Sequence, residues 1–191
     1  MRLNDPLVTS FVYEGNEYAI DLSFDNVLDV FDQLDDKALR EHEKAEICLA
    51  LLLNETTFKG EKAINLWNYI YEEFIKIESK KPIEYDRLGN PLPMKEEEEK
   101  NFINLDKDAK YIFASFKQAY NMNLFEQQGK LHWHEFQALL SGLPSDTFMQ
   151  RIIQIRMWEP SQDESTEYKK AMRELQKVYA LEDNEEWEEV D

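Results

Sequence analysis

The segment SFDNVLDVFDQL, residues 23–34, is the clearest indication of the fold of this chain. Its apolar residues recur at spacings of three and four, which places them on one face of an α-helix. They are Phe24, Val27, Leu28, Phe31 and Leu34. Ser23 precedes them, and serine is a preferred N-cap because its hydroxyl accepts a hydrogen bond from a free backbone N–H. The pattern predicts an amphipathic helix over 24–34.

A β-hairpin is predicted on the N-terminal side of this helix. Residues 9–13 and 17–22 flank a turn that contains Gly15 and Asn16, and apolar residues alternate along the second segment. Two strands alone are marginally stable in water, so we expect the hairpin to pack on helices.

More helices are predicted on the C-terminal side. Apolar stripes with helical spacing occur over 37–54, 61–78, 106–120, 131–141, 145–156 and 165–180. Only five glycines and six prolines interrupt the 191 residues, which also favours helix. The predicted fold class is mainly α, a helical bundle of about six or seven helices with a short N-terminal β-hairpin.

Composition divides the chain into four parts. Residues 8–78 hold the hairpin and the first helices, and 79–104 carry prolines and a glutamate run that predict a linker or long loop. Residues 105–181 form a C-terminal helical region, either as a second domain or as one domain with the first. The last ten residues, 182–191, contain seven acids and no base, which predicts an acidic disordered tail.

The charge of the chain excludes two classes of partner. With 40 acids against 22 lysines and arginines, the net charge is −18. Nucleic-acid affinity comes from cations that displace phosphate counterions, and anionic membranes also attract cations, so neither partner is expected. The longest uncharged apolar run, 47–53, is far shorter than the roughly 20 residues that cross a bilayer. Residues 101–160 are balanced, with six acids and six bases.

A calcium site fits the sequence poorly. Asn104, Asp106 and Asp108 occupy the first, third and fifth positions of an EF-hand loop. However, Ala109 stands where the loop needs glycine, and Ser115 stands where it needs a bidentate glutamate. An ordinary acidic helix start explains these residues better.

Other chemical motifs are equally weak. His132 and His134 would lie about 200° apart on a helix, which does not suit a shared metal ion. Cys48 lies in the apolar run ICLAL, where burial disfavours the reactive thiolate. The sequence contains neither a glycine-rich phosphate loop nor a G-x-S-x-G elbow. We therefore expect no catalytic activity, no cofactor and no metal.

The balanced segment contains an aromatic block, LHWHEFQALLSGLP, at residues 131–144. Core packing explains a periodic apolar stripe, but aromatic residues are also enriched at the centres of interfaces. We predict that this apolar surface is shared between the core and a partner or a second copy. The candidate residues are Trp133, Phe136, Leu140, Ile152 and Ile155.

The same region resembles a phage family. The resemblance rests on DKDAKYIFASFKQAY (106–120), LHWHEFQALLSGLP (131–144), IIQIRM (152–157) and a closing stretch that ends in KVYAL (177–181). These segments are similar to the "gene product fifteen" family of long-tailed phages and prophages of Gram-positive bacteria. The hairpin and helices of 1–78 agree in order and spacing, so the resemblance covers roughly residues 8–181.

The resemblance implies a tail assembly chaperone without catalytic activity. Such a protein keeps the tape measure protein soluble until the tail tube polymerises around it, and it is absent from the mature virion. The implied partners are the tape measure protein, further copies in oligomers or spirals, and the major tail protein. The implied location is the cytoplasm of the infected or lysogenic bacterial host.

Two other functions stay open at this point. One is a structural tail or connector protein that is retained in the virion. The other is an acidic protein that mimics DNA and inhibits a host enzyme, which the net charge would suit.

Overall fold

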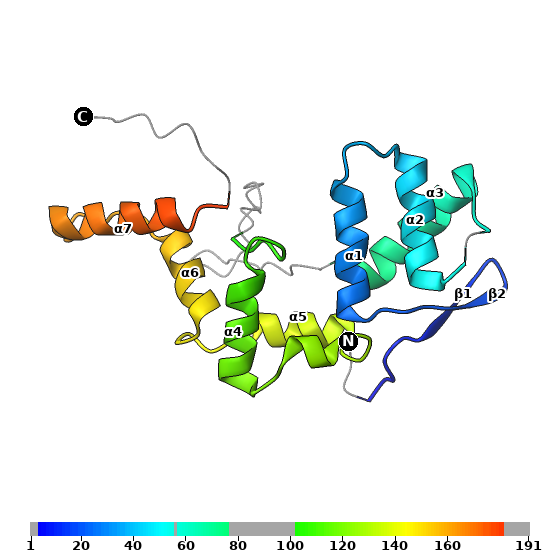
Figure 1. Ribbon diagram of the computed structural model, residues 1–191, viewed down its shortest axis with the longest axis horizontal. Coiled ribbons are helices and arrows are strands. Elements are labelled where there is room, and N and C mark those ends of the chain that lie inside the picture. The colour runs from blue at the N-terminus through cyan, green and yellow to red at the C-terminus, as the bar shows by residue number, and fades with distance from the viewer. Residues whose placement is uncertain (1–3, 56, 77–101, 182–191) are drawn as a thin grey trace, which may run out of the picture. The chain divides into compact units, whose positions relative to one another are not determined.

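A computed structural model describes residues 4–55, 57–76 and 102–181 of the chain (Figure 1). Within these residues, seven α-helices follow a two-stranded antiparallel hairpin. This confirms the predicted mainly α fold class. The predicted tail, 182–191, and the predicted linker up to residue 101 lie outside the described residues.

The described residues form two compact units. The first contains 4–55, 57–76 and 125–138, and the second contains 102–124 and 139–181. The first unit is therefore discontinuous in sequence, whereas the sequence-based division into 8–78 and 105–181 is continuous. Periodicity identifies the apolar face of a helix but not the unit on which that face packs.

The hairpin consists of β1 (Ser10–Tyr13) and β2 (Asn16–Ala19), with Phe11 opposite Tyr18. Its turn is Glu14-Gly15, and both residues have positive φ, +49° and +82°. Positive φ at both central residues is the mark of a type I′ turn, whose twist matches that of the strands. Asn16, which we expected in the turn, is the first residue of β2.

The hairpin packs on helices, as expected for a pair of strands that is marginal alone. Phe11 is buried, and its ring contacts those of Tyr69 and Phe74 with centroid distances of 5.9 and 5.4 Å. Tyr18, which lies on the other strand, contacts the ring of Phe58. Aromatic pairs therefore join the hairpin to the helical part of the first unit.

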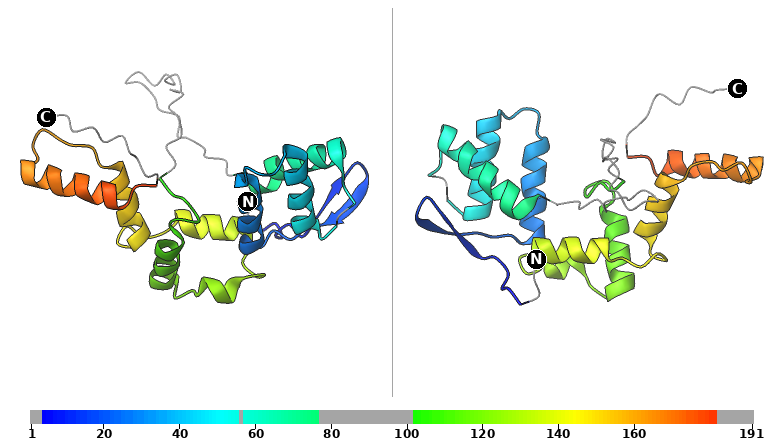
Figure 2. Two further views of the ribbon diagram at one scale, coloured as in Figure 1. Left: turned by 45° about the horizontal axis from the view of Figure 1, so that its top comes forward. Right: turned by 180° about the vertical axis from the view of Figure 1, so that it is seen from behind.

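The first unit contains α1 (Phe24–Asp35), α2 (Glu41–Leu53) and α3 (Gly60–Ile70). Helix α2 packs between α1 and α3, and Figures 1 and 2 show the three helices together from three directions. Helix α3 continues into a π-helical turn, Tyr71–Ile75, which the backbone N–H of Lys76 closes by donating to the carbonyl of Tyr71. The predicted helix over 61–78 therefore changes its hydrogen-bond pattern at residue 71.

Two backbone hydrogen bonds tie α1 to the start of α5 (Trp133–Ser141) within the first unit. The Phe24 N–H donates to the Leu131 carbonyl at 2.9 Å, and the Trp133 N–H donates to the Leu22 carbonyl at 2.7 Å. Ser23 occupies the expected N-cap position, but its buried hydroxyl makes no capping hydrogen bond and has no partner among the described residues. The two backbone hydrogen bonds with Leu131 and Trp133, and not a side-chain cap, therefore mark the start of α1.

The second unit contains α4 (Ala109–Tyr120), α6 (Phe148–Met157), α7 (Thr166–Val178) and the last residues of α5. A 3₁₀ turn, Leu124–Gln127, follows α4, and from Phe125 on it belongs to the first unit. Within the described residues, no helix is both long and apolar enough to cross a bilayer.

One buried arginine joins four segments of the second unit. Arg156 donates to both carboxylate oxygens of Asp108 at 2.7 Å. It also donates to the backbone carbonyls of Phe102 and Tyr179, each at 2.7 Å. The side chains of Arg156 and Asp108 are 8% and 1% exposed, so water screens this ion pair little.

Arg156→Met should destabilise the second unit by about 3–5 kcal/mol, because it leaves the Asp108 carboxylate buried without a counter-charge. Arg151→Met is the matched control, since Arg151 is exposed on the same helix and should change stability by less than about 0.5 kcal/mol. Chemical denaturation followed by circular dichroism measures both. Equal stability of the two variants would contradict a structural role for the ion pair.

Candidate partner-binding surfaces

The five residues predicted as a partner surface lie in different environments. Trp133 and Phe136 belong to the core of the first unit, and Ile152 belongs to the core of the second. Leu140 and Ile155 are half-buried in the second unit. The structure therefore does not bring the five together on one exposed surface, and the first three have the core role that the sequence also allowed.

Trp133 is completely buried because both its ring and its polar atom are used inside the first unit. The indole Nε1–H donates, at 3.0 Å, to the carbonyl of Ile75, the last residue of the π-helical turn. The ring stacks on Phe136 and meets the edge of Phe31, each with a centroid distance of 5.6 Å. A buried Trp needs such a partner for its N–H, and here that partner lies 58 residues earlier in the chain.

The sequence predicted that His132 and His134 lie on one helix. In the structure α5 begins at Trp133, so only His134 is helical. The Nδ1 of His132 accepts a hydrogen bond from the His134 backbone N–H at 3.2 Å, and its Nε2 lies 3.2 Å from the Val8 carbonyl. The rings lie side by side with centroids 5.2 Å apart. Burial lowers the pKa of His134, and the neighbouring His132 lowers it further. Within the described ranges, no three His, Cys, Asp or Glu side chains gather as a metal site would require.

Exposed apolar side chains concentrate on α6 and α7. Eight large apolar side chains are exposed among the described residues, and five of them lie on these two helices. They are Phe148, Met157, Tyr168, Leu175 and Val178. Helix α7, all of whose residues are described, contains no buried residue. In Figures 1 and 2 it runs back along the connection that follows α6, and its C-terminal end, drawn in red, lies near the end of α6.

The apolar stripe of α7 is wider than the part that α6 covers. Gln176 attaches α7 to the end of α6 by donating to the carbonyls of Ile155 and Trp158, at 3.0 and 2.8 Å. The other side of the stripe carries exposed residues at spacings of i, i+3, i+7 and i+10. They are Tyr168, Ala171, Leu175 and Val178, which we call the α7 row. At 100° per residue they lie within about 80° of the helix circumference, so they form one strip.

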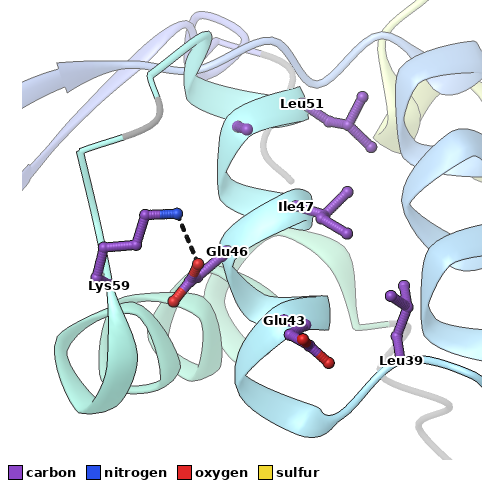
Figure 3. Close-up of a pocket in the computed structure, with 7 residues that line it drawn as sticks. Leu39, Glu43, Glu46, Ile47, Leu51 and Lys59 are labelled. Carbon is purple, nitrogen blue, oxygen red and sulfur yellow. Dashed lines mark hydrogen bonds and ion pairs between the residues drawn. The ribbon is translucent and has the colours of Figure 1, made fainter.

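A second apolar surface lies on the first unit, in a groove along α2 (Figure 3). Its volume is about 480 Å³, and we call it the α2 groove. It is lined by Leu39, Glu43, Glu46, Ile47, Ala50, Leu51 and Lys59. Figure 3 shows Leu39, Ile47 and Leu51 on one side of α2 and the Glu46–Lys59 pair on the other.

The two carboxylates of the α2 groove are ionised at neutral pH. A hydrogen bond from the Arg40 side chain lowers the pKa of Glu43 to about 2. Glu46 accepts from Lys59 at 2.6 Å and from the Gly60 backbone N–H at 3.0 Å, and these bonds lower its pKa. The groove therefore combines an apolar floor with two ion pairs, Arg40–Glu43 and Lys59–Glu46, at its rim.

Charge is divided unequally between the two units. The described residues of the first unit include 18 acids and 7 bases, a net charge of −11, whereas those of the second include 8 acids and 9 bases, a net charge of +1. The sequence indicated this asymmetry through the balanced segment 101–160. It did not indicate the α7 row or the α2 groove, because periodicity shows an apolar face without showing whether another element covers it.

The described residues thus define an acidic, mainly α-helical protein with uncovered apolar surfaces on both units. The model of one protein family, Bacteriophage Gp15 protein, matches residues 3–181. The match spans most of the chain, so the chain belongs to the bacteriophage Gp15 family, which confirms the phage family seen in the sequence. No curated protein and no solved structure matches the chain.

Trp133→Ala should destabilise the first unit by about 3–5 kcal/mol, because it opens a cavity and leaves the Ile75 carbonyl without its donor. Val12→Ala, at a 63% exposed position of the same unit, should cost less than about 0.5 kcal/mol. Urea denaturation measures both variants. A Trp133→Ala protein with wild-type stability would show that Trp133 is not a core residue.

The stability of the first unit should fall as the pH is lowered from about 7 to about 5. The pKa of His134 is below its usual 6.5 in the folded state, so the unfolded chain binds more protons over this range. The stability that neutral His134 contributes is fully present above the pKa that this residue has in the unfolded chain. It is lost as the pH falls towards the lower pKa that His134 has in the folded protein. His134→Gln should show a smaller change of unfolding free energy over the same range. An unchanged pH dependence in this variant would assign the effect to other groups.

Proposed function

We propose that this chain is a tail assembly chaperone that binds the tape measure protein and keeps it soluble until the tail tube polymerises around it. Membership of the Gp15 family supports a phage role. The observation that carries the proposal further is the α7 row, a strip of exposed apolar side chains on a helix without buried residues. Exposed apolar surface of this kind marks an interaction site.

The α7 row suits a helical partner. Before it is enclosed in a tube, a long tape measure helix exposes an apolar stripe that favours aggregation. Residues at i, i+3, i+7 and i+10 are the anchors with which amphipathic helices bind apolar surfaces. Helix α7 can therefore cover part of such a stripe by helix packing.

The charge of the first unit supports the same role. A complex coated by units of net charge −11 stays soluble, since like charges repel neighbouring complexes. Each contact is small, so one copy binds weakly, but several contacts along one tape measure chain raise the total affinity. Tube subunits, which gain their own polymer contacts, can then displace the copies one at a time.

The proposal places the protein in the cytoplasm of the infected or lysogenic host and outside the mature virion. A structural tail or connector protein is the second candidate, because family membership fits it as well. Mass spectrometry of purified particles distinguishes the two, since a connector is present in a fixed copy number. An acidic DNA mimic is a third candidate that the charge of the first unit would suit, but such a protein has no use for the α7 row.

Co-expression with the tape measure protein of the same phage tests the proposal. The wild-type chain should raise the soluble fraction of the tape measure several-fold and should co-purify with it. The double variant Leu175→Glu with Val178→Glu should lose most of this effect, because each substitution places a charge in the apolar contact.

The matched control is Gln154→Glu with Gln162→Glu, which adds two negative charges at exposed positions of the same unit. This control should behave as the wild type does. A tape measure protein that stays insoluble with the wild-type chain would contradict the chaperone role. Equal activity of the two double variants would show that the α7 row is not the binding surface.

A further inference from the structure

The α7 row and the α2 groove are both apolar surfaces, one on an exposed helix and the other in an open groove. The row is a convex strip with anchors at i, i+3, i+7 and i+10 on an exposed helix. The groove is an open concave surface of about 480 Å³ whose floor is formed by the half-buried Leu39, Ile47 and Leu51. An amphipathic helix that places its apolar face in an apolar groove is a common mode of recognition.

The segments that carry the two surfaces also have net charges of opposite sign. Residues 24–53, which form α1, α2 and their connection, contain eight acids and three bases, a net charge of −5. Helix α7 contains four bases and two acids, a net charge of +2, and its Lys170, Arg173 and Lys177 are exposed. Opposite charge favours encounter between α7 and the groove and disfavours wrong pairings.

Charge also limits how two copies can meet. Two first units, each of net charge −11, repel one another, so a contact between two groove surfaces is disfavoured. Two second units are nearly neutral, and a contact between two α7 helices would leave the groove unused. The pairing that joins opposite charge and buries both apolar surfaces unites the second unit of one copy with the first unit of another.

We propose that α7 of one copy docks in the α2 groove of a second copy. The contact uses a different surface on each partner, so it is heterologous and joins copies head to tail. Each added copy presents a new free row and a new free groove, and assembly continues until a ring closes or a filament forms. In the free protein this contact covers the row that we propose for the tape measure, and in this respect the inference rests on the proposed function.

Two variants that each remove one surface test the proposal. The row variant is Leu175→Glu with Val178→Glu, and the groove variant is Ala50→Glu, which places a charge among the residues that line the groove. Leu39→Asp is a second groove variant at a different position. Circular dichroism verifies that each variant is folded, and sedimentation velocity measures its mass over a range of concentrations.

The wild-type chain should form oligomers whose mean mass rises with concentration and falls when salt is raised from about 0.05 M to about 1 M, because salt screens the opposite charges. Each variant alone should be monomeric. An equimolar mixture of the row variant and the groove variant should form a complex of two chains and nothing larger, because the mixture retains one intact row and one intact groove per pair.

Other outcomes overturn the proposal and identify the alternative. A wild-type chain that is monomeric at all concentrations excludes contact between copies. A groove variant that still associates as the wild type does indicates pairing between α7 helices. A mixture without a two-chain complex excludes the head-to-tail contact. The control Gln154→Glu with Gln162→Glu should associate as the wild type does, and its failure would show that added charge alone disrupts assembly.

The experiment separates this inference from the proposed function, because it contains no tape measure protein. A monomeric chain that still keeps the tape measure soluble would overturn the head-to-tail contact and leave the chaperone role intact. Oligomers that dissociate on mutation but never solubilise the tape measure would support the head-to-tail contact and contradict the chaperone role.

Discussion

The ion pair between Arg156 and Asp108 is the interaction on which the second unit depends. It joins the start of α4 to α6, and the same guanidinium holds the carbonyls of Phe102 and Tyr179. Helix α7 contributes no buried side chain, and it is attached to the end of α6 by the hydrogen bonds of Gln176 and by the ring contact between Trp158 and Tyr168. A buried ion pair in which every guanidinium nitrogen donates a hydrogen bond is costly to break and specific in geometry. The exposed row of α7 is therefore presented by a well-defined attachment, although the helix has no core of its own.

The first unit is organised around a different constraint, the burial of Trp133. Its indole N–H donates to the last residue of the π-helical turn after α3. Next to it, two backbone hydrogen bonds join Trp133 to Leu22 and Phe24 to Leu131. Residues 125–138 are thereby part of the acidic first unit although they lie in the charge-balanced part of the sequence. The result is two units of very different net charge in one chain, each with an uncovered apolar surface. This combination supports both a role in binding helical partners and an ordered contact between copies.

The candidate surfaces were only partly accessible to sequence analysis. The stripe of α7 is visible as Tyr168, Ala171, Met172 and Leu175 at helical spacing, and the apolar character of α2 is visible in ICLALLL. Neither pattern indicated an exposed surface, because most periodic apolar residues are covered by another element. In α2 the positions on one side are buried and Ile47, Ala50 and Leu51 are not, a distinction that a helix apolar on all sides does not reveal. Conversely, the aromatic block around Trp133 predicted a surface shared between the core and a partner, and its Trp133 and Phe136 lie in the core of the first unit.

The sequence by itself determined the elements of this protein, since periodicity, turn residues and charge act locally. The hairpin, the seven helices and the acidic character of the N-terminal half follow from residues close together in the chain. Only the tertiary structure decided which faces are covered. That outcome depends on contacts between distant residues, such as Trp133 with Ile75 and Arg156 with Asp108, for which one sequence carries no local signal. The surfaces available to partners are what remains after those contacts are made, so they are properties of the fold and not of any segment.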